Sequence, residues 1–161
     1  MTEIETCSLP KPTGPVALSD DLWVGPAPRP GTTSDLKSAG FRSIINNQPD
    51  TDAGLLMTSS QMEAEAKSCG LDYTYIPIEG HNPLERDVRS FHKALTEMPH
   101  PIFAYCRSGG RSASLWAMAT VAENDTDSLI ARCRDIGFDI SGLQTKLDMR
   151  RALLADGDMD E

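Results

Sequence analysis

The chain has 161 residues and a net charge of -9 at pH 7, and 39% of its residues are hydrophobic. That length is enough for one domain with a substantial core. The negative charge argues against nucleic acid or an anionic membrane as the main partner. No apolar run approaches the ~20 residues that span a bilayer, so we expect no membrane insertion.

The four cysteines stand far apart, at positions 7, 69, 106 and 133, and neither a CxxC pair nor a signal peptide is recognisable. This usage favours a reducing cytoplasm over a disulfide scaffold, so we expect a cytoplasmic protein. The cysteines and the three histidines also lack the spacing of metal ligands. The pattern therefore predicts neither a metal site nor a cofactor.

Short strands alternate with helices between a proline-containing flexible arm at 1–15 and an acidic tail at 156–161. Strands are expected at 22–24, 41–46, 71–78 and 101–105, and helices at 34–39, 60–69, 83–98, 112–123, 126–136 and 141–154. Ser60 with Glu63, and Asn82 with Pro83, are the expected N-terminal signals of the second and third helices. The alternation predicts a single α/β domain over 16–155, three-layered, with a mostly parallel central sheet and helices on both faces.

The most informative segment lies at 101–112, with the sequence Pro-Ile-Phe-Ala-Tyr-Cys-Arg-Ser-Gly-Gly-Arg-Ser. A strand, a tight loop and a helix N-terminus follow one another there. Cys106 stands at the carboxyl end of the strand, where open α/β sheets bind their ligands. Such a loop turns backbone N–H groups inward, and the helix dipole adds partial positive charge. The pattern predicts a thiolate nucleophile beside an anion cradle.

Within this segment Cys106 is the predicted nucleophile. Arg111 is the predicted anion clamp, because a guanidinium can hold an oxyanion by two parallel hydrogen bonds. The expected anion-binding loop comprises Arg107, Ser108, Gly109, Gly110, Arg111 and Ser112. A buried structural cysteine is the alternative, but two arginines and two glycines would then have no packing purpose.

The chain resembles the bacterial phosphatase-like domain family, whose members stand alone or are fused to metallo-β-lactamase-fold persulfide dioxygenases. The likeness rests on Gly-Phe-Arg-Ser-Ile-Ile-Asn-Asn-Gln-Pro-Asp at 40–50, on Gly-Leu-Asp-Tyr and Ile-Pro-Ile within 70–78, and on Tyr-Cys-Arg-Ser-Gly-Gly-Arg-Ser at 105–112. Gln48 stands where many relatives carry arginine, so we expect this chain to lack a basic contact near the opening of the active site. The resemblance implies a fold like that of dual-specificity phosphatases, with phosphatase or sulfurtransferase activity.

Two features favour sulfur transfer. Dual-specificity phosphatases share a His-Cys-x5-Arg loop, whereas here four residues separate Cys106 from Arg111, and Tyr105 replaces the histidine. This shorter ring resembles the rhodanese loop and should hold a persulfide sulfur better than a phosphoryl group. Phosphate ester hydrolysis also needs a general acid. The aspartate of dual-specificity phosphatases is missing from 79–83, where only Glu79 and His81 could serve.

The main expectation is therefore a rhodanese-like sulfurtransferase that forms a persulfide on Cys106 and is linked to sulfide or persulfide metabolism. The alternative is a cysteine-dependent phosphatase with a phosphocysteine intermediate, and a third is a persulfide-sensing or anion-binding module. The expected partners are a small anionic sulfur or phosphate substrate and a persulfide dioxygenase or thiol acceptor. Asp50 is a further candidate mouth residue, although a turn-forming role is favoured there.

Overall fold

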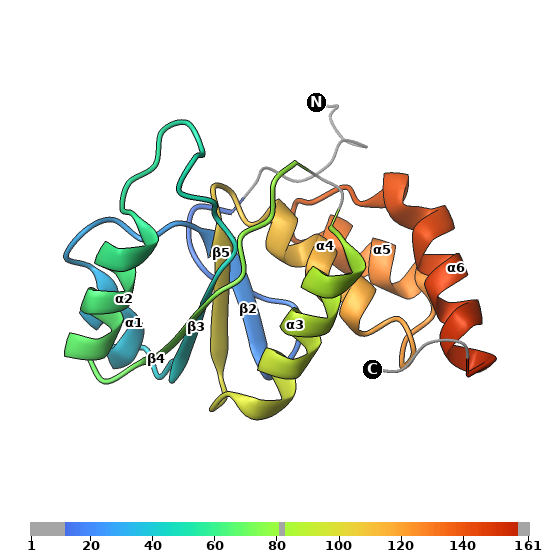
Figure 1. Ribbon diagram of the computed structural model, residues 1–161, viewed down its shortest axis with the longest axis horizontal. Helices are drawn as coiled ribbons and strands as arrows, with labels where there is room; N and C mark the ends of the chain where they lie inside the picture. Colours follow the sequence, from blue (N-terminus) through green and yellow to red (C-terminus); the bar gives the residue numbers. More distant parts are fainter. Residues whose placement is uncertain (1–11, 81–82, 158–161) are drawn as a thin grey trace, which may run out of the picture.

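The computed structural model describes residues 12–80 and 83–157. The strands are β1 (Val16–Ala17), β2 (Leu22–Pro26), β3 (Ser43–Asn46), β4 (Asp72–Tyr75) and β5 (Ile102–Cys106). The helices are α1 (Thr33–Ser38), α2 (Ser59–Ser68), α3 (Glu85–Glu97), α4 (Gly110–Ala119), α5 (Thr126–Asp135), the short 3-10 helix η1 (Ser141–Leu143) and α6 (Gln144–Ala155). Figure 1 shows α1 and α2 on one face of the sheet and α3 to α6 on the other. The predicted three-layer α/β fold is confirmed.

The sheet has the strand order β1-β2-β5-β3-β4. Strands β2, β5, β3 and β4 run parallel, and only the short β1 pairs antiparallel, with β2. The central strand β5 is buried along its whole length, as a parallel strand covered on both faces must be. Because the four parallel strands end at one edge, Cys106 lies at the edge where such sheets bind ligands.

Alternate residues of β5 pack in two hydrophobic clusters, one on each face of the sheet. Ile102 and Ala104 pack in the cluster formed with α3 to α6, whereas Phe103 and Tyr105 pack in the cluster formed with α1 and α2. Tyr105, the residue before the cysteine, stacks on Phe103 with ring centroids 6.0 Å apart. Its side chain is therefore part of the core on the side of α1 and α2.

The N-terminus of α2 differs from the sequence prediction. Thr58, not Ser60, caps the helix: its Oγ1 accepts the N–H of Gln61 at 3.2 Å. The Gln61 side chain in turn accepts the N–H of Thr58 at 2.9 Å. The prediction of Ser60 with Glu63 was wrong because three successive hydroxyl residues can each cap, and the reciprocal bonds select the first of them.

The start of α3 also differs. The helix begins at Glu85 after an extended Leu84, and Asp87 accepts the Leu84 N–H at 3.2 Å. The predicted start at Pro83 was therefore too early, because this bond anchors the first turn two residues later. Asn82 lies outside the described residues.

The first strand, β1, pairs with β2 at one edge of the sheet. Just before it, Gly14 lies against β2, where a Cβ added to Gly25 would come within 2.8 Å of the Gly14 carbonyl oxygen. Residues 1–11 and 158–161 are outside the described part of the chain, so the flexible arm and the tail stay predictions. Among the described residues, no helix is long and apolar enough to cross a membrane.

An ion pair between a buried arginine and a partly exposed glutamate joins the C-terminal helix to the rest of the domain. The Arg150 side chain is only 2% exposed and bonds both oxygens of Glu85, at 3.1 Å from Nε and 3.0 Å from Nη2. Its Nη1 also donates to the carbonyl of Met118 at 2.9 Å. Arg150 thus ties α6 to the beginning of α3 and the end of α4.

Candidate active site

The site is built on the turn between β5 and α4. Cys106 is the last residue of β5 and is 1% exposed. Gly109, with a φ of 110°, is the N-cap of α4, and its N–H donates to the Cys106 Sγ at 3.1 Å. A left-handed backbone at this point favours glycine over other residues. The turn therefore directs at least one backbone donor at the sulfur.

Phe138 packs directly on this turn and explains why Gly109 is needed. A Cβ on Gly109 would lie 2.9 Å from the Cζ of Phe138 and 3.0 Å from the Cα of Gly25. A Cβ on Gly110, whose backbone is helical, would touch the same ring at 3.5 Å. The ring of Phe138, which is 4% exposed, is thus a support for the catalytic turn.

Arg111 is held by Asp52, a residue that the sequence analysis did not select. Its Nη1 donates to Asp52 Oδ1 at 3.2 Å, its Nη2 donates to Oδ2 at 2.5 Å, and Nη1 also donates to the Ile78 carbonyl at 2.8 Å. The two side chains are only 10% and 14% exposed. A guanidinium has five N–H donors in a fixed plane. Three of them are occupied by these bonds, which leaves Nε–H and the second Nη2–H.

These two remaining donors lie on one edge of the guanidinium, which is the edge available to an anion. Burial opposes the charge of Arg111, but the hydrogen bond to Asp52 and the charge and hydrogen bond of Cys106 outweigh it, so the pKa of Arg111 is raised. Cys106 is therefore a direct neighbour of the guanidinium. The arrangement presents a two-pronged donor beside the sulfur, suited to two oxygens of one tetrahedral anion.

Asp52 is an ionised carboxylate in this arrangement. Its hydrogen bond with Arg111 outweighs burial and lowers its pKa below the usual range. Gln48 donates to Asp52 Oδ2 at 3.3 Å, and the Nε of Arg107 lies 3.9 Å from the same oxygen. Gln48 is neutral, so it orients Asp52 without competing with Arg111 for its charge. Asp52 thus fixes the arginine and is poorly suited to donate a proton.

Two residues expected at the site have other partners. Asp50 accepts the backbone N–H of Ser59 at 2.7 Å and its hydroxyl at 2.9 Å, so it holds the first turn of α2. Asp50 thus has a local structural role, and its place as a candidate mouth residue stays a prediction. Ser112 is fully buried and donates its hydroxyl to Asn47 Oδ1 at 2.7 Å. It therefore lies behind the anion-binding loop and braces it against β3.

The remaining candidate site residues lie at different places relative to the catalytic turn. The Arg107 side chain is 59% exposed at the rim, and Ser108 lines the same opening. Glu79 is exposed and does not line the cleft described below. His81 lies outside the described residues. Cys133 is not a second reactive thiol, because burial raises its pKa to about 12.

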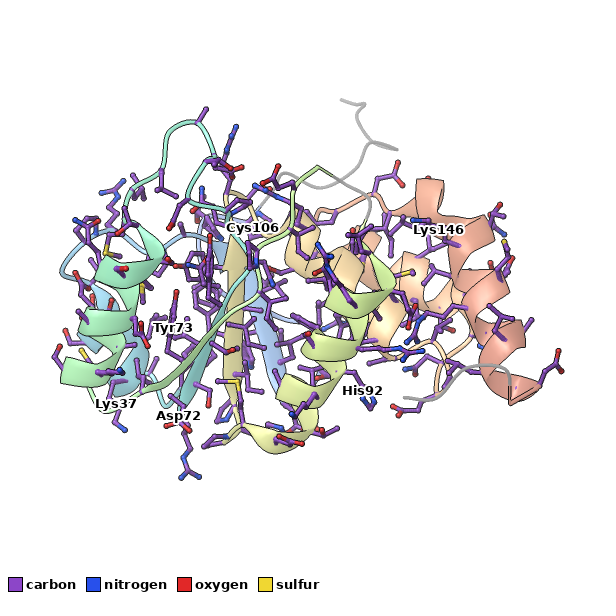
Figure 2. The ribbon with its side chains drawn as sticks, in the orientation of Figure 1. Lys37, Asp72, Tyr73, His92, Cys106 and Lys146 are labelled. Carbon is purple, nitrogen blue, oxygen red and sulfur yellow. The ribbon has the colours of Figure 1, made fainter. Side chains whose placement is uncertain are left out.

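The catalytic turn opens into a cleft of about 1060 Å³. One wall is formed by the turn itself, and the opposite wall by residues 137–146, which connect α5 to α6. Cys106 and Lys146 both lie in the upper half of Figure 2, Cys106 near the centre and Lys146 to its right. Among the described residues, no three His, Cys, Asp or Glu side chains gather as metal ligands would.

The phosphatase-like domain of beta-lactamase hydrolase-like proteins, as a sequence family, matches residues 16–123. The chain belongs to this family. A beta-lactamase hydrolase-like protein of Agrobacterium fabrum is 31% identical to this phosphatase-like domain over 103 residues, which are 64% of the chain and 24% of that protein. One from Xylella fastidiosa is 27% identical over 135 residues, 83% of the chain and 31% of that protein. The chain thus spans less than a third of the length of these curated relatives.

Solved structures place the phosphatase-like domain in the same fold as known phosphatases. A candidate phosphatase from Neisseria meningitidis matches with a TM-score of 0.74 and 23% identity, over 84% of this chain and 96% of that one. The kinase-associated phosphatase, crystallised with its catalytic cysteine changed to serine, matches with a TM-score of 0.71 and 20% identity, over 91% and 97% of the two chains. The fold is therefore phosphatase-like, as the sequence resemblance implied.

Proposed function

We propose that this domain hydrolyses phosphomonoesters through a phosphocysteine intermediate on Cys106. The observation that carries the proposal is the edge of Arg111 that lies beside Cys106 while Asp52 and Ile78 occupy the other donors. A phosphoryl group in transfer carries its charge on three oxygens, and donors held in advance around them are the main source of catalysis. The family description and the phosphatase names of the structural neighbours support the same activity. They support it better than the sulfurtransferase reading favoured by the sequence.

The proposed reaction has two steps. The thiolate of Cys106 attacks phosphorus, the P–O bond to the leaving group breaks, and the bond pair departs with that oxygen. Water then attacks the phosphocysteine, which releases inorganic phosphate and restores the thiolate. Arg111 and the backbone N–H groups of the turn hold the phosphoryl oxygens in both steps.

This proposal has two versions. In one, a general acid protonates the leaving oxygen; in the other, the leaving group departs without a proton. The carboxylates that line the cleft among the described residues are Asp52 and Asp139. Each has a lowered pKa and a hydrogen-bond partner, so neither is a proton donor near neutral pH. We therefore propose activity on esters with good leaving groups such as phenols. The rate should fall steeply as the phenol becomes less acidic, and Glu79→Gln and His81→Ala should leave that dependence unchanged.

The test compares turnover of 4-nitrophenyl phosphate by the full chain and its variants. Cys106→Ser should abolish turnover, because a hydroxyl is not ionised there near neutral pH. Arg111→Lys should lower kcat/KM by about 100- to 1000-fold, because an ammonium does not reproduce the two-pronged donor. The matched control is Cys69→Ser, a half-buried cysteine at the end of α2, which should keep full activity. Undiminished activity of Cys106→Ser would overturn the proposal.

Sulfur transfer is the second candidate, and the four-residue spacing between Cys106 and Arg111 is the observation that favours it. In that case thiosulfate should add one sulfur atom, about 32 Da, to Cys106, and cyanide or a thiol should remove it. Slow or absent turnover of aryl phosphates together with this mass gain would favour the sulfurtransferase. A link to persulfide metabolism, with a persulfide dioxygenase or a thiol acceptor as partner, belongs to this second candidate.

A further inference from the structure

One buried hydroxyl of the domain lacks a hydrogen-bond partner. Nine polar or charged residues are buried in the described part of the chain, and the side chains of eight of them form hydrogen bonds. The ninth is Ser114, which is 7% exposed and whose hydroxyl makes no hydrogen bond among the described residues. Buried polar groups are almost always paired, so this exception calls for a partner from outside the chain.

Ser114 lines the same cleft as the catalytic turn. It lies on α4, four residues after Gly110 and so about 6 Å further along the helix axis. Residues four apart lie on one face of a helix, and on this face a Cβ at Gly110 would meet the ring of Phe138. Ile140 and Leu143 also line the cleft. The unpaired hydroxyl is therefore in a partly apolar space, about one helical turn from the anion-binding loop.

Gly110 keeps the cleft open between the turn and Ser114. Its backbone is helical, and an added Cβ would make only ordinary contacts, at 3.5 Å from the Phe138 ring and 3.8 Å from the Ser108 Oγ. Neither backbone strain nor a clash requires glycine there, in contrast to Gly109. A Cβ would instead take up space in the cleft, which Gly110 lines. Its absence leaves room for a ligand that extends from the turn to Ser114.

The cleft is also large enough for more than a phosphoryl group. Its volume of about 1060 Å³ is at the upper end of the range of small-molecule sites, which is about 300–1,000 Å³. Ser114 carries no charge that would offset the lost hydration of an ionised group. A hydroxyl matches it better, because each of the two groups can both donate and accept.

We propose that the cleft binds the leaving group of the substrate and that Ser114 recognises a hydroxyl on that leaving group. The phosphate reacts at Cys106, and the carbon skeleton lies against Ile140 and Leu143. This inference rests on the proposed phosphatase activity and adds a substrate class to it. The preferred substrates are phosphate monoesters whose organic part carries a free hydroxyl, separated from the phosphate by roughly the length of one helical turn.

The experiment compares phosphate esters of 2-nitrophenols that differ only at ring position 4. Each hydroxyl substituent is paired with an alkyl group of the same length: hydroxymethyl with ethyl, 2-hydroxyethyl with propyl, and 3-hydroxypropyl with butyl. In at least one pair, kcat/KM of the full chain should be about three- to tenfold higher for the hydroxyl ester, the range of one neutral hydrogen bond. Ser114→Ala should remove most of this preference. The control Ser90→Ala, at an exposed serine within α3, should retain it.

Thermal unfolding distinguishes a ligand contact from a structural role. Ser114→Ala removes a buried hydroxyl that has no internal partner, so its melting temperature should rise. A lowered melting temperature would mean that the hydroxyl stabilises the fold through the chain itself, and would overturn the proposal.

Binding to Cys106→Ser, measured by calorimetry, makes the outcome independent of turnover. That variant should bind the hydroxyl ester of the preferred pair more tightly than the alkyl ester, and the added change Ser114→Ala should remove most of the difference. Equal affinities in all three pairs would mean that Ser114 binds water only, and would overturn the hydroxyl site. If the difference is found but no ester is hydrolysed by the full chain, the binding site stands and the proposed phosphatase activity fails.

Discussion

Replacing Asp52 with asparagine should loosen Arg111 while every group of the anion site stays in place. Asparagine keeps one oxygen acceptor but turns an NH2 group toward the guanidinium, so one of the two bonds and the negative charge are lost. A hydrogen bond to a charged group contributes about 1.5–3 kcal/mol. The Ile78 carbonyl still holds Nη1, so we expect a loss of about 2 kcal/mol in the free energy of unfolding, below the usual cost of breaking a buried ion pair.

The same change should lower kcat/KM for 4-nitrophenyl phosphate by about 10- to 100-fold, since about 1.4 kcal/mol corresponds to a factor of ten. A double-mutant cycle with Arg111→Lys tests whether Asp52 acts through the arginine. In the Arg111→Lys background, Asp52→Asn should cost less than about threefold, because the group that Asp52 orients is already gone. Asp125→Asn is the control: its Oδ1 accepts the N–H of Ser128 at 2.7 Å and caps α5.

The pH dependence distinguishes a positioning role from general acid catalysis. The pKa of Asp52 is lowered by the bond to Arg111, so the carboxylate is ionised throughout about pH 5 to 8. Asp52→Asn should therefore reduce the height of the pH–rate profile without changing its shape. The stability that Asp52 adds is present above about pH 4 and is lost as the pH falls through its lowered pKa. This reasoning would be refuted if Asp52→Asn lowered kcat/KM equally in the wild-type and Arg111→Lys backgrounds. Loss of the alkaline limb of the pH–rate profile in Asp52→Asn would also refute it.

Three further predictions concern the supports of the site and the ion pair that ties α6 to the domain. Gly109→Ala should abolish activity and lower stability, because the residue has a φ of 110° and its Cβ would lie 2.9 Å from Phe138. Thermal unfolding and turnover measure the two effects, and wild-type values for both would contradict the prediction. Phe138→Leu should cost about 1–2 kcal/mol and lower kcat more than it raises KM, because the ring supports the turn; an unchanged kcat would show that it does not. Glu85→Gln should cost about 2 kcal/mol at pH 7, because the buried guanidinium of Arg150 then lacks the negative charge of Glu85. Burial opposes the charge of Glu85, but Arg150 and Arg89 lower its pKa, so this cost should shrink as the pH falls below about 4; a cost independent of pH would contradict the assignment.

The layers and the catalytic turn were predictable because their signals are local. The turn from Cys106 to Arg111 is contiguous, and the burial of β5 on both faces follows from its apolar sequence. The starts of α2 and α3 were less predictable. Several residues in each stretch could begin the helix, and the choice depends on reciprocal bonds such as that between Thr58 and Gln61.

The supports of the site could not be predicted in the same way. Asp52 is 59 residues from Arg111 in the chain, and two aspartates in the same loop, Asp50 and Asp52, give the same sequence signal. Only the fold shows that the first holds α2 and the second holds the arginine. Phe138 follows a glycine after α5 and has no feature that marks it as a support of the turn. Its role arises from packing between distant segments.

The most direct test of the central claim is the mass of Cys106 during turnover. The full chain is mixed with 4-nitrophenyl phosphate, quenched in alkali within the first turnovers and digested, and the peptide containing Cys106 is weighed. We predict a gain of about 80 Da on that cysteine, the mass of a phosphoryl group, and complete loss of turnover in Cys106→Ser. An unmodified Cys106 together with persisting turnover in Cys106→Ser would contradict the account.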